Sequence, residues 1–95
     1  MPKAYWIAHV TVSEPDSYGL YAQGATEVFE KYGAKVLARG GAVVGLEGES
    51  RPRNVVIEFE SLEAAQACYD SPEYQAARKF RIGAGDAQIM LLEGV

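Results

Sequence analysis

The feature that most constrains this chain is its first segment, an expected strand with apolar side chains on both faces. Residues 4–12 are rich in Val, Ile, Thr, Tyr and Trp and contain no Gly or Pro, which is typical of a β-strand. Tyr5 and Ile7 lie on one face, and Trp6 and Val10 lie on the other. A strand of this kind needs cover on both sides, so we expect it inside a sheet.

An amphipathic helix is expected next. Ser13 can cap it, Pro15 fits near its first turn, and Asp16 favours the positive helix end. Gly33 is a natural stop. Between them, apolar or aromatic residues recur with the i, i+3, i+4, i+7 spacing of a single helix face, namely Tyr18, Tyr21, Ala22, Ala25, Val28, Phe29 and Tyr32.

The rest of the chain predicts three more strands and a second helix that is split in two. Gly40 and Gly41 interrupt the first of these strands with a bulge or a bend. The order strand, helix, strand, strand, helix, strand predicts an α+β fold of the ferredoxin-like βαββαβ type, with a four-stranded antiparallel sheet. The expected strands are 35–47, 54–60 and 87–93, and the expected helices are 61–70 and 71–82.

The two-faced strands also predict a partner. In a ferredoxin-like sheet the first and third strands are the central pair, and both helices cover one face. The last strand nevertheless places Met90 and Leu92 opposite Ile89 and Leu91, so it too is apolar on both faces. An uncovered apolar face usually marks an interface. We therefore expect a homodimer in which two sheets pack face to face through the open sheet face.

Length and composition limit the remaining classes. The 95 residues predict a single domain over residues 1–95. A net charge of −4 argues against a nucleic-acid partner or an anionic membrane surface. The apolar stretches are too short to cross a bilayer and no signal-peptide pattern begins the chain, so we expect a cytoplasmic protein. The lone Cys68 is expected in the core rather than as a nucleophile.

Several short motifs occur in order over nearly the whole chain. They are Tyr18 and Tyr21, Arg39-Gly40-Gly41, Leu46-Glu47-Gly48, Glu58-Phe59, Ser71-Pro72-Glu73-Tyr74, Arg78 and Glu93-Gly94. With these motifs the chain resembles the domain of unknown function 1330 family of the dimeric α+β barrel superfamily. The resemblance implies two ferredoxin-like protomers whose sheets form a barrel, and it implies no particular reaction. The superfamily includes cofactor-independent monooxygenases, heme-degrading enzymes, muconolactone isomerase-like proteins and ligand-sensing regulators, among which fold alone does not choose.

His9 and Glu58 are the candidate catalytic residues. Glu58 lies within a strand, where a carboxylate must be paired, hydrogen-bonded or protonated. His9 is the only histidine and lies midway along the neighbouring strand. If the strands align, the two could meet in a cavity, where burial raises a carboxylate pKa and suits it to general-base work. The alternative is structural: a hydrogen-bonded pair, or Glu58 paired with Arg39 or Arg53 across the dimer.

Arg39 and several tyrosines are the candidate substrate-binding residues. Arg39 stands beside Gly-Gly and could orient an anionic or carbonyl substrate, or it could form an ion pair with Glu47 or Glu58. Tyr18, Tyr21 and Tyr69 could line a pocket for an organic molecule, although aromatic residues at helical spacing are more often core. The basic run Arg78, Lys79 and Arg81 is typical of a solvated helix end, with phosphate binding as the alternative.

Two functional hypotheses remain. One His and one Cys cannot build the usual zinc sites, and the sequence contains no EF-hand, phosphate loop or dinucleotide fingerprint. A carboxylate-only Mg²⁺ or Ca²⁺ site stays open as the alternative, but we expect neither metal nor cofactor. The first hypothesis is a cofactor-independent enzyme acting on a small organic molecule in a pocket between helices and sheet, with His9 or Glu58 as acid or base. The alternative is a non-catalytic ligand-binding or stress-associated dimeric module.

Overall fold

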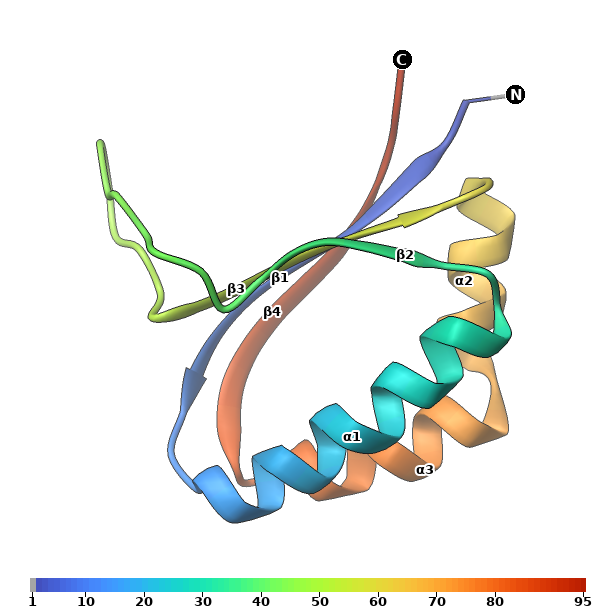
Figure 1. The fold of residues 1–95 in the computed structure, drawn as a ribbon. Coiled ribbons are helices and arrows are strands. Elements are labelled where there is room, and N and C mark those ends of the chain that lie inside the picture. The colour runs from blue at the N-terminus through green and yellow to red at the C-terminus, as the bar shows by residue number, and fades with distance from the viewer. Residues whose placement is uncertain (1) are drawn as a thin grey trace.

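The four strands form one sheet in the order β2-β3-β1-β4, and every neighbouring pair is antiparallel. The computed structural model describes residues 2–95. β1 and β3 are the central pair, as the ferredoxin-like pattern predicts (Figure 1). The strands are β1 (Ala4–Val12), β2 (Lys35–Arg39), β3 (Arg53–Phe59) and β4 (Gly85–Glu93).

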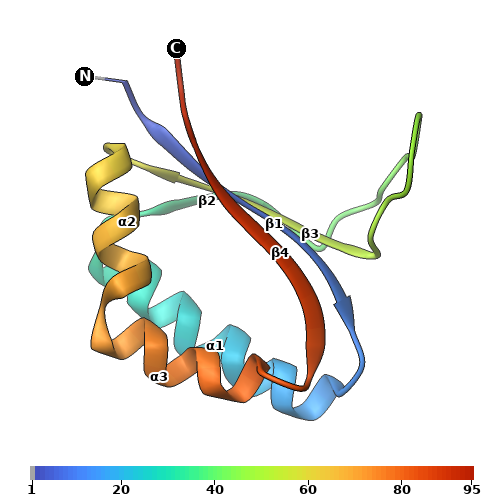
Figure 2. The ribbon, with the colours of Figure 1, turned by 180° about the vertical axis from the view of Figure 1, so that it is seen from behind.

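Three helices cover one face of the sheet: α1 (Pro15–Lys31), α2 (Leu62–Asp70) and α3 (Pro72–Arg81). α1 and α3 run side by side, and α2, which precedes α3 in the chain, lies towards the other end of the sheet (Figures 1 and 2). A Cβ atom on Gly24 of α1 would lie 3.2 Å from the Cβ of Ala77 on α3, so glycine lets these helices approach closely. The predicted βαββαβ order with a split second helix is confirmed.

Ser71 is the residue that splits the second helix. Its Oγ accepts a hydrogen bond from the Tyr74 backbone N–H at 3.1 Å and so caps α3. The same hydroxyl donates to the Cys68 carbonyl at 2.8 Å and satisfies the end of α2. α1 begins differently from the prediction: its N-cap is Glu14, with no side-chain cap, and Ser13 instead uses its backbone N–H to donate to the Ala84 carbonyl.

The core is built around the indole of Trp6 on β1, which is 1% exposed. Its ring centroid lies 5.1 Å from that of Phe29 on α1 and 5.0 Å from that of Tyr74 on α3, both in edge-on geometry. Phe59 on β3 and Tyr69 on α2 lie 6.1 and 5.7 Å away. All three helices and the central strand pair therefore meet on one side chain. Such aromatic pairs add roughly 0.5–1.5 kcal/mol each beyond area burial.

The second strand is shorter than predicted. β2 ends at Arg39, and residues 40–52 form a loop that projects from the sheet (Figure 1). Gly40 has φ +67°, a left-handed conformation that turns the chain out of the strand, and its N–H donates to the Asn54 carbonyl at 3.1 Å. The register shift of β2 lies between Val36 and Ala38 instead. β3 and β4 begin at Arg53 and Gly85, slightly earlier than predicted.

The opposite face of the sheet is bare of helices in the described chain (Figure 2). Met90 and Leu92 of β4 point to this side and are 49% and 50% exposed, whereas Ile89 and Leu91 pack against the core. The expectation that the strands are apolar on both faces therefore agrees with the structure. We call this side the open sheet face.

Replacing Ser71 with Ala should destabilise the protein by about 1–2 kcal/mol, because a buried hydroxyl that serves two helix ends is lost. We expect the melting temperature to fall by roughly 5–10 °C in thermal unfolding followed by circular dichroism. Ser17→Ala, at an exposed position of α1, is the control and should change little. Equal melting temperatures for the two variants would contradict this role of Ser71.

Candidate ligand-binding site

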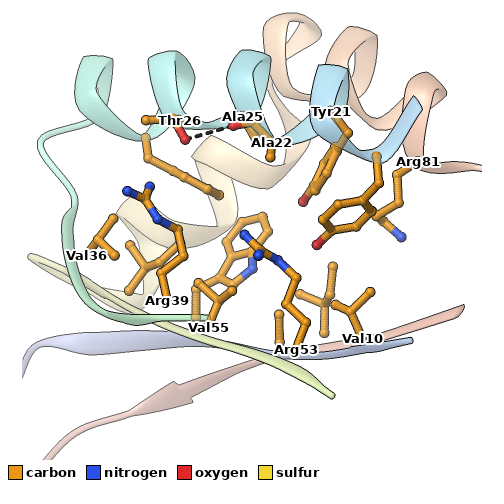
Figure 3. Close-up of a pocket in the computed structure, with 16 residues that line it drawn as sticks. Val10, Tyr21, Ala22, Ala25, Thr26, Val36, Arg39, Arg53, Val55 and Arg81 are labelled. Atoms are coloured by element: carbon orange, nitrogen blue, oxygen red, sulfur yellow. Dashed lines mark hydrogen bonds between the residues drawn. The ribbon is translucent and has the colours of Figure 1, made fainter. Parts of the chain in front are cut away.

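A pocket lies between α1 and the helix-covered face of the sheet (Figure 3). About 40 Å³ of it is enclosed space, and the volume rises to about 480 Å³ when the space at the open mouth is included. The charged residues among those that line it are three arginines, and the rest of the wall is largely apolar. The lining residues are Trp6, Ala8, Val10, Tyr18, Tyr21, Ala22, Ala25, Thr26, Phe29, Val36, Arg39, Arg53, Val55, Ile57, Arg81 and Ile89.

Two of the arginines come from neighbouring strands at the base of the 40–52 loop. Arg39 is the last residue of β2 and pairs in register with Val55 of β3. Arg53 is the first residue of β3 and shares its alternation with Val55, which points to the helices. Both guanidinium groups extend from the sheet into the space below α1 (Figure 3). The strand register therefore places two positive charges on one wall.

Two of the guanidinium groups lie over tyrosine rings in cation–π contacts. The Cζ of Arg53 lies 5.4 Å from the ring centroid of Tyr18, and the Cζ of Arg81, the last residue of α3, lies 5.1 Å from that of Tyr21. The Tyr21 hydroxyl shares a 2.8 Å hydrogen bond with that of Tyr74. Burial raises the pKa of Tyr21 well above its ordinary range, and the Tyr74 hydroxyl adds to the effect. Tyr21 is therefore a neutral phenol at neutral pH.

The positive charge of the pocket is uncompensated. Within residues 2–95, the cations that form ion pairs are Lys3, Lys31 and Arg51, and none of them lines the pocket. The Nε atoms of Arg53 and Arg81 are buried and find no hydrogen-bond acceptor among the described residues. Each unsatisfied buried donor costs about 1–3 kcal/mol, so a ligand with acceptor atoms would recover this free energy.

His9 does not line this pocket, contrary to the hypothesis that placed it there. It lies on the open sheet face, because its neighbours Ala8 and Val10 take the helix side of β1. His9 pairs in register with Asn54, and its Nδ1 lies 2.6 Å from the Asn54 Oδ1. Since the Asn54 Nδ2 donates to the Arg51 carbonyl, that Oδ1 is an acceptor and the Nδ1 of His9 donates to it.

Glu58 is on the open sheet face as well, but it does not meet His9. Its register partner on β1 is Tyr5, whose hydroxyl donates to Glu58 at 3.4 Å, and the Nζ of Lys3 lies 3.7 Å away. Tyr5 and His9 are four residues apart along β1, which is roughly 13 Å in a strand. Within the protomer Arg39 points away from Glu58, because it lines the pocket on the other side of the sheet. The strand register therefore separates the two candidate catalytic residues along this face of the sheet.

The other predicted residues divide between pocket and core. Tyr18, Tyr21 and Arg39 line the pocket, as the substrate-binding hypothesis requires. Tyr69 does not: its ring packs on Trp6 and on Tyr74, and it borders a separate shallow hollow. Cys68 is fully buried, and burial raises the pKa of its thiol to about 11, which agrees with a core role.

The lining residues that the sequence did not single out as site residues include Trp6, Arg53 and Arg81. Trp6 was assigned only to a strand face, and Arg81 was assigned to a solvated helix end. Arg53 was considered only as a partner of Glu58. Its position two residues before Val55 and four before Ile57 gives it the parity of the buried face, so this signal was available in the sequence.

The described residues contain no cluster of three or more His, Cys, Asp or Glu side chains able to hold a metal ion. They also contain no helix with the length and apolarity needed to cross a membrane. The pocket itself offers guanidinium and hydroxyl donors, which suit an organic ligand with acceptor atoms.

Several solved structures share this fold, among them those of three proteins from different bacteria. A protein of unknown function from Rhodopseudomonas palustris, RPA0582, is 23% identical with a TM-score of 0.71 over 99% of this chain and 83% of its own. SnoaB, a cofactor-independent oxygenase from Streptomyces nogalater, is 7% identical with a TM-score of 0.69 over 97% of this chain and 92% of its own. A dimeric ferredoxin-like protein of unknown function from Thermobifida fusca is 16% identical with a TM-score of 0.57 over 97% and 91%.

The sequence comparison agrees with the resemblance drawn from the motifs. The model of the family described as domain of unknown function (DUF1330) matches residues 3–95. No curated protein matches this chain. The solved structures, all below 25% identity, establish the fold and leave the activity open.

Replacing Arg53 with Met should stabilise the ligand-free protein. The change removes a buried unpaired Nε and one of three like charges, while the new side chain still covers Tyr18. The recovered free energy, about 1–3 kcal/mol, exceeds the roughly 0.5–1 kcal/mol of the lost cation–π contact. We expect the melting temperature of ligand-stripped protein to rise by about 2–8 °C. Arg39→Met, at an exposed side chain, should have a smaller effect, and a lower melting temperature for Arg53→Met would contradict the uncompensated charge.

Proposed function

Because this chain belongs to the family described as domain of unknown function (DUF1330), we propose its function from the geometry of its pocket: the protein binds a small organic molecule between α1 and the sheet. The observation that carries the proposal is a pair of buried guanidinium Nε atoms, those of Arg53 and Arg81, that have no acceptor among the described residues and lie in a largely apolar pocket. Convergent polar groups in an apolar cavity are the usual signature of a ligand site.

The pocket favours binding over acid–base catalysis. Its lining contains no His, Asp, Glu, Lys or Cys, and its buried phenol Tyr21 has a raised pKa. Tyr21 would therefore keep its proton near neutral pH instead of exchanging it with a ligand. This supports the binding module among the two hypotheses drawn from the sequence. The cytoplasmic location expected there stays a prediction.

We also propose that two copies pack through the open sheet face. The half-exposed Met90 and Leu92 would be buried there, and a protein of the same fold is described as dimeric. His9 and Glu58 would then lie at the interface between copies. Native mass spectrometry should find a species at twice 10.3 kDa, and Met90→Glu with Leu92→Glu should convert it to monomer. A monomeric wild-type protein would contradict the proposal.

A second candidate function is cofactor-independent catalysis in the same pocket. The uncompensated arginines support it, because they would stabilise a substrate that binds already ionised, and SnoaB shows that the fold can carry such an oxygenase. The protein should then take up oxygen in the presence of its natural ligand, and Arg53→Gln should abolish this uptake. Loss of uptake in His9→Ala or Glu58→Gln would instead place the chemistry on the open sheet face.

Filling the pocket tests the binding function. We expect native mass spectrometry of protein purified gently from its own cells to show added mass that disappears on denaturation. Ala22→Leu should reduce the occupancy about tenfold, because Ala22 lines the pocket and the larger side chain takes ligand space. Ala76→Leu, the same change at an exposed position of α3, is the control and should keep the ligand. Equal occupancy in the two variants would place the ligand elsewhere.

A further inference from the structure

We infer that the ligand of the pocket is a small aromatic carboxylate, with its carboxylate bound by Arg53 and Arg39 and its ring held between α1 and the sheet. The inference rests on the proposed function and deepens it by naming the ligand class. Three features of the site carry it: the sign of the charge, the geometry of the donors and the shape of the apolar walls.

The charge in the pocket is opposite to that of the whole chain. The protein carries 13 Asp and Glu against 9 Lys and Arg, yet the pocket gathers three arginines and no acidic residue. Cations at a surface can be solvated, but the Nε of Arg53 is buried and has no acceptor in the described chain. A neutral ligand would leave this charge without a partner. The pocket is therefore suited to an anion.

The donors suit a carboxylate. A guanidinium offers N–H groups in a planar fork that binds the two oxygens of a carboxylate together. The Tyr18 ring supports the Arg53 group from one side, at 5.4 Å, and leaves its N–H donors for another acceptor. Arg39 extends into the same space from the adjacent strand and is the more exposed of the two (Figure 3). Arg53 would thus bind the carboxylate inside, and Arg39 would cover it at the mouth.

The walls suit a flat ring. Alanines lie on both sides of the pocket, Ala8 on β1 and Ala22 and Ala25 on α1, so short side chains face one another across the space. Trp6 and Phe29, two rings in edge-on contact, form the apolar end of the wall. Aromatic rings prefer such stacked or edge-on neighbours, so a ring would pack here better than a branched alkyl group.

Matched pairs of probes test the inference. Naphthalene-2-carboxylate, cinnamate and indole-3-carboxylate are each compared with their primary amides, which keep the shape and lose the charge. Trp6 is the only tryptophan and lines the pocket, so its indole N–H signal in NMR titrations reports binding directly. We expect at least one acid to bind about tenfold or more tightly than its amide. Arg53→Gln should remove that preference, and Arg53→Lys, which keeps the charge but not the fork, should lower it partly.

Arg78→Gln is the matched control, because Arg78 also has an unpaired buried Nε but does not line the pocket, and it should leave the preference intact. Each variant is first checked for a folded NMR spectrum. Equal binding of acids and amides, or an acid preference that survives Arg53→Gln, would overturn the inference and leave the binding function standing. Tighter binding of a matched aryl phosphate would also overturn it. If no probe moves the Trp6 signal at millimolar concentration and no ligand is retained from cells, the proposed function fails together with it.

Discussion

The fold depends on the packing of aromatic rings around Trp6. This side chain leaves the central strand and contacts rings from all three helices and from β3, so it fixes the distance between the helix layer and the sheet. The same indole also lines the pocket. Because one ring serves both, the interaction that stabilises the core also determines the depth of the space available to a ligand.

The pocket combines small side chains with charges that the protein does not neutralise. Alanines on α1 and β1 line the space beside the core rings, and the Nε atoms of Arg53 and Arg81 find no acceptor among the described residues. Both features lower the stability of the isolated protein. Sites that are suboptimal for stability in this way are typical of functional sites, where the missing interactions are supplied by a ligand. The open sheet face is separate from this site and is suited to a different partner, a second copy.

The features of the fold that the sequence predicted correctly are those that depend on residues close together in the chain. The α1 face was evident because its apolar residues repeat with the helical period over four turns, and the break at Ser71 was evident because serine and proline both favour a helix start. Residues 40–52 were assigned wrongly in part, because Val and Leu in this stretch resemble a strand while Gly40 turns the chain away. Part of the candidate site followed from the sequence: Tyr18, Tyr21 and Arg39 line the pocket, while Arg53 and Arg81 were given other roles.

The sequence by itself determined the order of the elements, the ferredoxin-like topology, the apolar character of both sheet faces and the burial of Cys68. Only the tertiary structure decided which side chains meet. Residues on a strand alternate between two faces, and the register with the next strand selects each partner. A shift of one residue would therefore change both the face and the partner of every side chain. That register brings His9 to Asn54 and Tyr5 to Glu58 on one face, and it directs Arg39 and Arg53 into the pocket on the other. Neither assignment is contained in a local pattern, because each depends on strands that are distant in the chain.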